Sequence, residues 1–260
     1  MTAAGRTVQP RLATTAFMTA ACVLATGCSG VQSMLDPAGP AAGDIARLWW
    51  WMAGGATLIL GLVLALLAWS LRRRRGRLAP ARGIRLIVAG GVVLPVAVLL
   101  VLLVFGTRVG YAVKTLGGGP AHVVEVEGRQ WAWTFRYLDA DGRVAAVTHD
   151  RLRMPLGRVV EYRVSARDVI HSFWIPRLGG KIDAIPGRVT HLRLRADRLE
   201  PIRGQCAEFC GLEHAHMAFD VDVVPGRDYD RWLALGGPSA TAVTATGAVA
   251  TPGPLPPETP

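Results

Sequence analysis

Residues 204–217 read GQCAEFCGLEHAHM, and this short stretch holds two thiols, two imidazoles, two carboxylates and a thioether. The pattern Cys-x3-Cys-x3-His-x2-Met collects soft ligands at short intervals. Thiolate and thioether ligands favour copper over magnesium, calcium or manganese. We therefore expect a metal site here and call residues 204–217 the metal loop. A disulfide between the two cysteines is the simpler alternative, but it leaves the histidine and methionine at these offsets unexplained.

The positive charge of the chain is concentrated in one place outside this loop. The 260 residues carry a formal net charge of +10 at pH 7, and seven arginines lie between Arg72 and Arg85. Residues 118–235, in contrast, hold 17 Lys and Arg against 16 Asp and Glu. Basicity this local does not match an extended nucleic-acid surface, so we expect no nucleic-acid partner.

The first 28 residues resemble a secretory signal. Arg6 and Arg11 give a positive start, and small apolar residues follow from 13 to 25. The sequence ATGCSG at residues 25–30 resembles the processing site of a bacterial lipoprotein, in which Cys28 becomes the lipidated first residue. Simple cleavage, or an uncleaved helix, is the alternative. Four cysteines in the whole chain are too few for a scaffold built on disulfides.

Two apolar stretches are long enough to cross a lipid bilayer. After a turn-rich spacer over residues 29–46, the first covers residues 47–71 and the second residues 84–106. Pro95 in the second stretch is tolerated in a membrane helix and is expected to kink it. The arginine-rich loop at residues 72–83 should face the cytoplasm and contact anionic lipid. The N-terminus and the metal loop are then expected on the outer side of a bacterial inner membrane.

From residue 118 the sequence pattern becomes that of β-structure. Short runs of β-branched and aromatic residues alternate with turn signals, and no long helical pattern appears. We expect an all-β sandwich or barrel over residues 118–226. Residues 236–260 are rich in Gly, Pro, Ala and Thr and are predicted to remain disordered. The strand candidates are residues 123–126, 131–137, 159–165, 189–194 and 218–224, with turns at 139–142 and 155–157.

A further ligand for the metal loop is available some 35 residues earlier, at His171. A lone histidine beside apolar residues is usually only a packed side chain, but the nearby ligand set favours a role at the metal. One cysteine, two histidines and a methionine suffice for a mononuclear copper site. The second cysteine is then surplus, and two thiolates can bridge two metals.

Together these features resemble subunit II of cytochrome c oxidase, whose outer domain is a cupredoxin barrel that holds the binuclear CuA centre. The resemblance runs from about Gln32 to about Val224. It includes the two spans and the metal loop, together with QWAW at 130–133, DVIHSF at 168–173 and KIDAIPGR at 181–188. The two membrane spans are expected to form an antiparallel helical hairpin that precedes the barrel.

The resemblance implies a ligand set for two copper ions. It consists of two bridging thiolates, one imidazole for each copper, and a thioether and a backbone carbonyl as weak axial ligands. The carboxylate next to that carbonyl would reach a magnesium ion shared with subunit I. These groups would come from Cys206 and Cys210, His171 and His214, Met217, and the carbonyl and side chain of Glu208.

Trp131 matches the tryptophan through which this family accepts electrons from cytochrome c. The alternative is an ordinary buried or interface aromatic residue. Trp133 lies two positions further, so in one strand both would point to the same side, and only the family pattern favours Trp131. Asp183 and Arg188 lie in a motif that resembles the contact surface with subunit I.

Two features depart from the family pattern. His216 stands where the family usually has an apolar aromatic residue, so it competes with His214 as a ligand, although the spacing favours His214. The surface expected to receive cytochrome c is also less acidic than usual. Electrostatic steering of a basic cytochrome should therefore be weak, which favours a less basic or membrane-held donor.

The leading hypothesis is thus the subunit through which electrons enter a terminal respiratory oxidase. It would accept them from cytochrome c and pass them to haem in subunit I, where oxygen is reduced to water. One alternative is the copper-free subunit of a quinol oxidase, whose members lack the ligand set. The other is a membrane-anchored copper-binding or assembly protein, which would not need the motif at 181–188 or Glu208.

Overall fold

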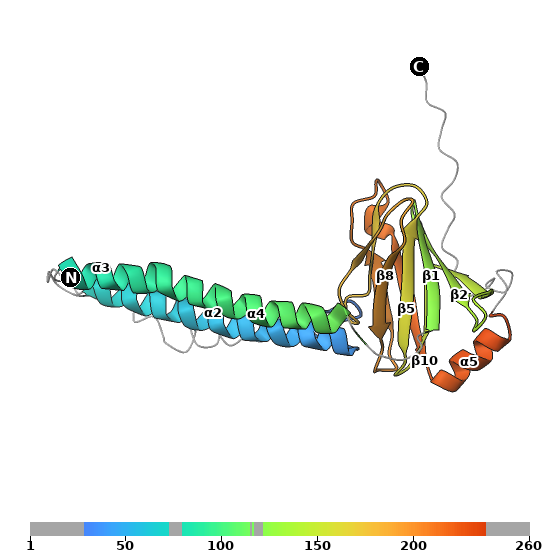
Figure 1. The fold of residues 1–260 in the computed structure, drawn as a ribbon, viewed down its shortest axis with the longest axis horizontal. Coiled ribbons are helices and arrows are strands. Elements are labelled where there is room, and N and C mark those ends of the chain that lie inside the picture. Colours follow the sequence, from blue (N-terminus) through green and yellow to red (C-terminus); the bar gives the residue numbers. More distant parts are fainter. Residues whose placement is uncertain (1–28, 73–79, 115, 117–121, 238–260) are drawn as a thin grey trace, which may run out of the picture.

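The computed structural model describes residues 29–72, 80–114, 116 and 122–237. Within them the chain forms a long helical hairpin that ends in a β-sandwich (Figure 1). This confirms the predicted fold class. The proposed signal with Cys28, most of the arginine-rich loop, and nearly all of the tail lie outside the described residues.

The hairpin consists of two long apolar helical segments. The first is α2 (Pro40–Arg72), and the second joins α3 (Pro80–Val88), η2 (Ala89–Val93) and α4 (Leu94–Lys114). Each has an 18-residue window with no buried residue, and the mean hydropathy of these windows is 2.1 and 3.0. By length and composition both can cross a membrane, because about 20 apolar residues span the hydrocarbon core.

Helix α2 begins earlier than the sequence predicts. The spacer expected over residues 29–46 ends at Gly39, because Pro40 already occupies the first helical position, where its missing N–H is not needed. The first turn is held by the β-sandwich through a hydrogen bond from Ala42 N to the Leu178 carbonyl at 3.2 Å, and Ala41, Ala42 and Ala46 are buried. Small residues such as these do not form the long apolar runs from which the two spans were predicted.

The irregularity expected at Pro95 takes the form of the π-helical turn η2. The N–H of Leu94 bonds to the carbonyl of Ala89, five residues earlier. Proline has no N–H, and its ring clashes with the carbonyl four residues before it, so the regular hydrogen-bond pattern cannot pass through this position. The helix continues beyond it as α4.

Two five-stranded sheets form the outer domain. Their strand orders are β3-β2-β1-β5-β8 and β4-β10-β9-β6-β7, and the β1–β5 and β4–β10 pairs are parallel. All five strand candidates appear as strands, and the remaining five had no distinct sequence signal. The strands are β1 (His122–Arg129), β2 (Ala132–Leu138), β3 (Val144–His149), β4 (Arg151–Pro155), β5 (Val159–Ala166), β6 (His171–Trp174), β7 (Ile182–Ala184), β8 (Thr190–Arg195), β9 (Ile202–Cys206) and β10 (Ala218–Val224).

Aromatic side chains fill the space between the sheets. Phe173 of β6 and Phe219 of β10 stack with ring centroids 5.2 Å apart, and Trp133 and Phe135 of β2 meet them edge-on or tilted. All four are almost completely buried. Because residues two apart on a strand share a face, β2 directs Trp133 and Phe135 into the core together. This cluster lies directly behind the strands that carry the metal loop.

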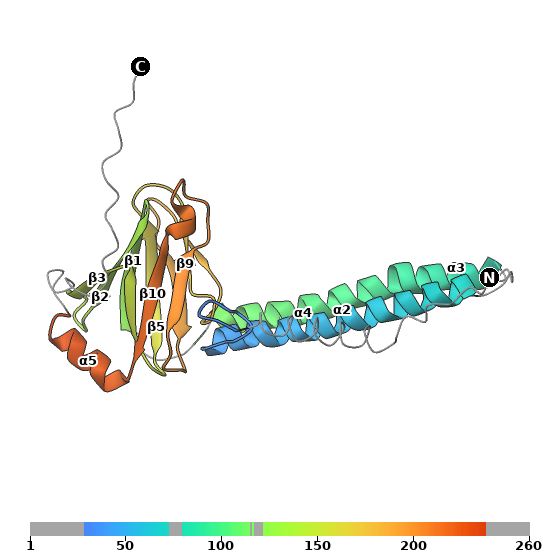
Figure 2. The ribbon, with the colours of Figure 1, turned by 180° about the vertical axis from the view of Figure 1, so that it is seen from behind.

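A short helix, α5 (Gly226–Ala234), follows β10 and was not predicted. Its Tyr229 is buried, and Trp232 packs edge-on against Tyr137 with centroids 4.8 Å apart. Its apolar residues Tyr229, Trp232 and Leu233 have the i, i+3, i+4 spacing of an amphipathic helix, but the segment is only nine residues long and was not singled out. The helix lies at the end of the sandwich opposite the metal loop (Figures 1 and 2).

Residues 31–42, which we call the N-terminal segment, tie the hairpin to the sandwich. Backbone hydrogen bonds join Ala38 to Arg177 and to Asp197, each at 2.8 Å. The buried guanidinium of Arg177 forms ion pairs with Asp36 at 2.8 Å and Glu200 at 2.9 Å. The segment therefore holds the outer domain in a defined position on its membrane anchor.

Candidate metal centre

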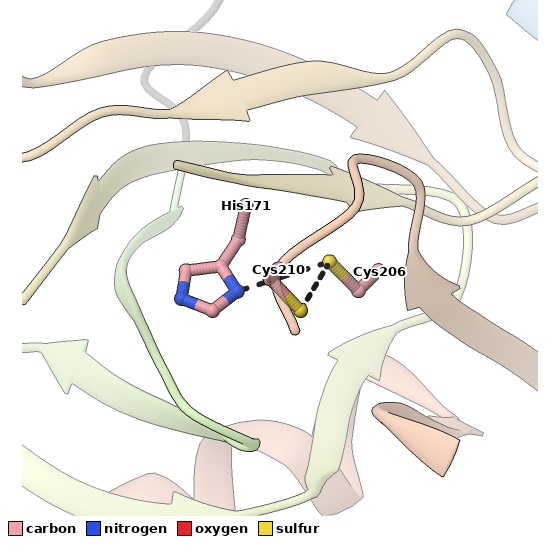
Figure 3. Close-up of side chains that lie close together, drawn as sticks. All are labelled: His171, Cys206 and Cys210. Carbon is pink, nitrogen blue, oxygen red and sulfur yellow. Dashed lines mark hydrogen bonds between the residues drawn. The ribbon is translucent and has the colours of Figure 1, made fainter. Parts of the chain in front are cut away.

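Strand pairing brings His171 to the metal loop. Strand β9 ends at Cys206, β6 begins at His171, and the two strands pair through Phe173 and Cys206. The loop then turns through Cys210 and re-enters the sheet as β10. His171 and the two cysteines, 35 residues further along the chain, thus converge at one end of the sandwich (Figure 3).

The converging atoms are suitable metal ligands. His171 Nδ1, Cys206 Sγ and Cys210 Sγ lie within 4.8 Å of one another, and all three residues are buried. The two sulfur atoms are 3.8 Å apart, and Cys206 Sγ is 3.8 Å from His171 Nδ1. Among the described residues this is the only His, Cys and carboxylate group of three or more that could hold a metal ion.

The other three predicted donors surround the same sulfur atoms. Cys210 Sγ lies 3.5 Å from His214 Nδ1 and 3.7 Å from Met217 Sδ. The carbonyl oxygen of Glu208 lies 3.2 Å from Cys206 Sγ. The structure therefore brings together all six predicted donor groups. Two thiolates, two imidazoles, a thioether and a carbonyl fit copper, which accepts this mixture of soft and intermediate ligands.

The disulfide alternative does not describe this loop. Cys206 and Cys210 are free, with sulfur atoms well beyond the bond length of about 2.05 Å. Burial, reinforced by the neighbouring Cys206 thiol, raises the pKa of Cys210 to about 12. Two thiols placed side by side in a buried pocket are suited to a cation, and its binding must release their protons.

Asp168 orients the first imidazole. Its Oδ1 lies 2.8 Å from His171 Nε2 and also accepts the Val169 N–H, while its Oδ2 accepts the Gln130 N–H at 2.7 Å. Burial opposes ionisation, but these hydrogen bonds hold the pKa of the Asp168 carboxyl below its usual value. Because a carboxylate only accepts, the His171 proton is held on Nε2 and Nδ1 is left free towards the sulfur atoms.

The structure distinguishes the two histidines of the loop. His214 points its Nδ1 at Cys210, whereas His216 is exposed and its Nδ1 lies 2.8 Å from the Glu213 carboxylate. Both occur in the short 3-10 helix η3 (His214–His216), which turns them in different directions. This arrangement agrees with the spacing argument for His214.

Trp131 lies beside the centre but not in the strand that was assumed for it. Strand β2 begins at Ala132, so the premise that Trp131 and Trp133 share a strand face is wrong. Trp133 is buried in the core, whereas Trp131 is half-buried in the turn before β2. Its indole Nε1 donates to the Cys210 carbonyl at 3.3 Å. The same carbonyl accepts the Gln130 side chain at 2.7 Å, a contact with no signal in the sequence.

The side chain of Glu208 points away from the sulfur atoms. It is half exposed, and its Oε2 lies 3.8 Å from Lys181 Nζ, which also donates to the Ala207 carbonyl. Asp183 and Arg188 are exposed on β7 and on the turn that leads from it to β8 in the other sheet. The resemblance motifs at 181–188 and 204–217 therefore share one edge of the sandwich.

Comparisons with known proteins agree with this geometry. The family model for the periplasmic domain of cytochrome c oxidase subunit II matches residues 140–224. Cytochrome c oxidase subunit 2 of Lycodon semicarinatus is 30% identical over 172 residues, covering 59% of this chain and 75% of that protein. The subunit 2 of Alkalihalophilus pseudofirmus is 40% identical over 110 residues, covering 42% of this chain but only 31% of that longer relative.

Among solved structures, the periplasmic domain of subunit II of cytochrome oxidase from Bradyrhizobium japonicum is 28% identical. It aligns with a TM-score of 0.42 over 46% of this chain and 95% of that domain. The assignment rests on the sequence relatives, since the match to the Lycodon protein extends over three quarters of its length. The chain belongs to the cytochrome c oxidase subunit 2 family.

Proposed function

We propose that this chain is the subunit through which electrons enter a haem–copper terminal oxidase. It accepts them from cytochrome c at a binuclear copper centre and passes them to haem in subunit I, where oxygen is reduced. The observation that carries the proposal is the convergence of six donor groups, two of them adjacent sulfur atoms, at one end of the outer domain. Family membership supports the same assignment.

The protein holds these donors with little freedom to move. His171 is anchored through Asp168, and Cys206 is the last residue of a strand paired on both sides. When bound, the two copper ions supply a one-electron redox site whose charge change is shared by two metals. A ligand set held rigidly rearranges little when an electron arrives, which keeps transfer fast.

Trp131 offers a direct route from the surface to a ligand. Its ring is partly exposed, and its N–H bonds to the carbonyl of Cys210, whose own sulfur lies in the centre. The close approach is aided by Gly211, where an added Cβ would lie 3.3 Å from the indole and where φ is +121°. We therefore assign Trp131 as the point at which electrons are received.

The proposed contacts with subunit I lie on another edge of the outer domain. The half-exposed Glu208 carboxylate, 3.8 Å from Lys181 Nζ, would reach a magnesium ion if the partner supplies the remaining ligands, since magnesium is commonly held by few protein carboxylates. Asp183 and Arg188 are exposed beside it and would contact the same partner. The apolar hairpin anchors this arrangement in a bacterial inner membrane, with the outer domain on the periplasmic side.

The alternatives explain fewer of these features. A copper-free quinol-oxidase subunit does not need two imidazoles and a thioether around two cysteine sulfur atoms. A membrane-anchored copper carrier needs the ligands but neither a tryptophan bonded to the Cys210 carbonyl nor an exposed Glu208 beside the metal loop.

Copper titration of the purified full-length chain tests the proposal. We expect a purple species with two copper ions per chain, and His214→Ala or Cys210→Ser should abolish its spectrum. His216→Ala is the matched control and should keep both the spectrum and the copper content, because His216 faces Glu213 in solvent. A colourless or one-copper wild type would refute the binuclear centre. Oxygen consumption with cytochrome c, after co-purification with a haem-bearing subunit, tests the electron route.

A further inference from the structure

The peptide that follows Cys206 is held by hydrogen bonds on both sides. The N–H of Ala207 donates to the Ser172 carbonyl at 2.9 Å, and the carbonyl of Ala207 accepts Lys181 Nζ at 3.0 Å. The next carbonyl along the chain, that of Glu208, lies 3.2 Å from Cys206 Sγ. Because peptide units are planar, fixing both polar groups of Ala207 restricts where the Glu208 carbonyl can point.

Lys181 reaches this peptide across a strand and not along the chain. It directly precedes β7, whose Ile182 pairs with Phe173 of β6. Since Phe173 is buried in the core and side chains alternate, Lys181 lies on the outer face of the sheet together with Ser172. On its other side β6 pairs with β9 through Phe173 and Cys206. The lysine side chain therefore crosses β6 to reach the segment that follows Cys206.

The same ammonium group has a second neighbour in the metal loop. Lys181 Nζ lies 3.8 Å from Glu208 Oε2, and both side chains are half exposed, so this ion pair by itself stabilises the loop little. The bond to the Ala207 carbonyl is shorter, at 3.0 Å. A lysine ammonium has three donors and no acceptor, so it can hold the carbonyl while it faces the carboxylate.

Both halves of the metal loop are thus tied to neighbouring segments. Gln130 and Trp131 donate to the Cys210 carbonyl, and Lys181 donates to the Ala207 carbonyl. The first two donors are neutral, whereas Lys181 carries a full positive charge. A positive charge beside a redox site favours the state that holds the extra electron, because the Coulomb attraction is greater in that state.

We propose that Lys181 is a positioning residue for the copper centre, which fixes the axial Glu208 carbonyl through the Ala207 carbonyl and favours the reduced state by its charge. This inference rests on the proposed function and adds a residue to the same site. The motif at 181–188 was interpreted only as a contact surface for subunit I. Its first residue serves the metal loop of its own chain.

Two substitutions of Lys181 test this role in the full-length chain in lipid nanodiscs. Lys181→Met keeps the length of the side chain but removes the donor and the charge, whereas Lys181→Arg keeps both. In Lys181→Met we expect the copper affinity to fall roughly tenfold in competition with a chelator, as when a group that orients a ligand is lost. The absorption spectrum at full copper loading should shift, and the reduction potential should fall. Lys181→Arg should restore the wild-type spectrum and potential.

Two further variants separate the possible causes. Arg203→Met removes an exposed positive charge from β9, the strand that ends at Cys206, but leaves the Ala207 carbonyl bonded. It should leave the spectrum and the copper affinity unchanged. Glu208→Gln removes the carboxylate and keeps the backbone carbonyl, so the spectrum should also persist if Lys181 acts through Ala207.

The outcomes distinguish this inference from the proposed function. If the wild type binds two copper ions and Lys181→Met has the same affinity, spectrum and potential, the function stands and the role of Lys181 is wrong. Equal changes in Arg203→Met, or no recovery in Lys181→Arg, would also overturn that role. A copper-free Lys181→Met chain that unfolds at a markedly lower temperature would show a general structural role instead. A wild type that binds one copper ion refutes the binuclear centre, whereas a lower affinity of Lys181→Met for that ion would still support the positioning role.

Discussion

At the scale of single residues, neighbours fix two of the candidate ligands, His171 and Cys210, and a paired strand carries a third, Cys206. Asp168 occupies one nitrogen of His171, and Trp131 and Gln130 occupy the carbonyl of Cys210. The ligand types and their spacing could be predicted, because the donor atoms are carried by the side chains themselves. The supporting contacts could not, since Gln130 and Cys210 are 80 residues apart and only the fold makes them neighbours.

Replacement of Asp168 by Asn should weaken metal binding without unfolding the domain. An amide can offer its NH2 group to His171, so the imidazole loses its fixed tautomer and orientation. We expect the affinity for copper to fall by roughly 10–100-fold, as is usual when a partner of a metal-bound histidine is lost.

The measurement is competition with a copper chelator, and Asp183→Asn serves as the control. Asp183 is exposed on β7, outside the hydrogen bonds that orient His171. Equal copper affinities for the two variants would show that Asp168 does not position the ligand.

At the scale of elements, the N-terminal segment and the first turns of α2 hold the sandwich in direct contact with the hairpin, which a flexible linker would not do. An added Cβ at Gly39 would lie 2.2 Å from the carbonyl oxygen of Arg195, so the segment runs in direct backbone contact with β8. The sequence indicated only a turn-rich spacer here, because glycine and alanine carry no periodic apolar signal. Strands with clear alternation, such as β5, were in contrast predicted nearly to their ends.

Substitution of Gly39 by Ala should therefore loosen the outer domain from its anchor. Backbone atoms cannot yield as a flexible side chain does, and we expect a loss of about 1–3 kcal/mol in the free energy of unfolding. Gly43→Ala, one helical turn further, meets no atom within 4 Å and should be neutral or slightly stabilising.

Thermal unfolding of the two detergent-solubilised variants, together with limited proteolysis of the segment, measures the difference. If both variants unfold at the wild-type temperature, the contact with Arg195 does not restrain the domain.

At the scale of the whole molecule, the arginines at the tip of the hairpin and the metal loop lie at opposite ends. Arg72 closes α2, and Arg82 and Arg85 lie in α3, at the end of the hairpin far from the sandwich (Figure 1). The overall plan, a hairpin followed by a β-sandwich, could be predicted because hydropathy and strand alternation extend over long stretches. The exact start of α2 could not, because it depends on packing against the sandwich, whereas α5 has an amphipathic pattern that is too short to stand out beside the long ones.

Reporter fusions test the membrane orientation that this distribution predicts. Alkaline phosphatase, which is active only outside the cytoplasm, should be inactive when fused after Arg72 and active when fused after Leu235. A green fluorescent protein that fails to fold after Sec export should give the reverse pattern at the same two positions. The opposite result would place the outer domain in the cytoplasm and contradict the positive-inside argument.

The strands of the sandwich run across the direction of the hairpin, and the metal loop lies at one end of those strands (Figures 1 and 2). The ligand cluster is consequently displaced sideways from the axis of the two helices. The N-terminal segment fixes the position of the sandwich relative to the hairpin, and therefore how far the ligand cluster lies from the helix axis. In the proposed orientation, a partner in the same membrane would lie beside the two helices and on the same side of them as the ligand cluster.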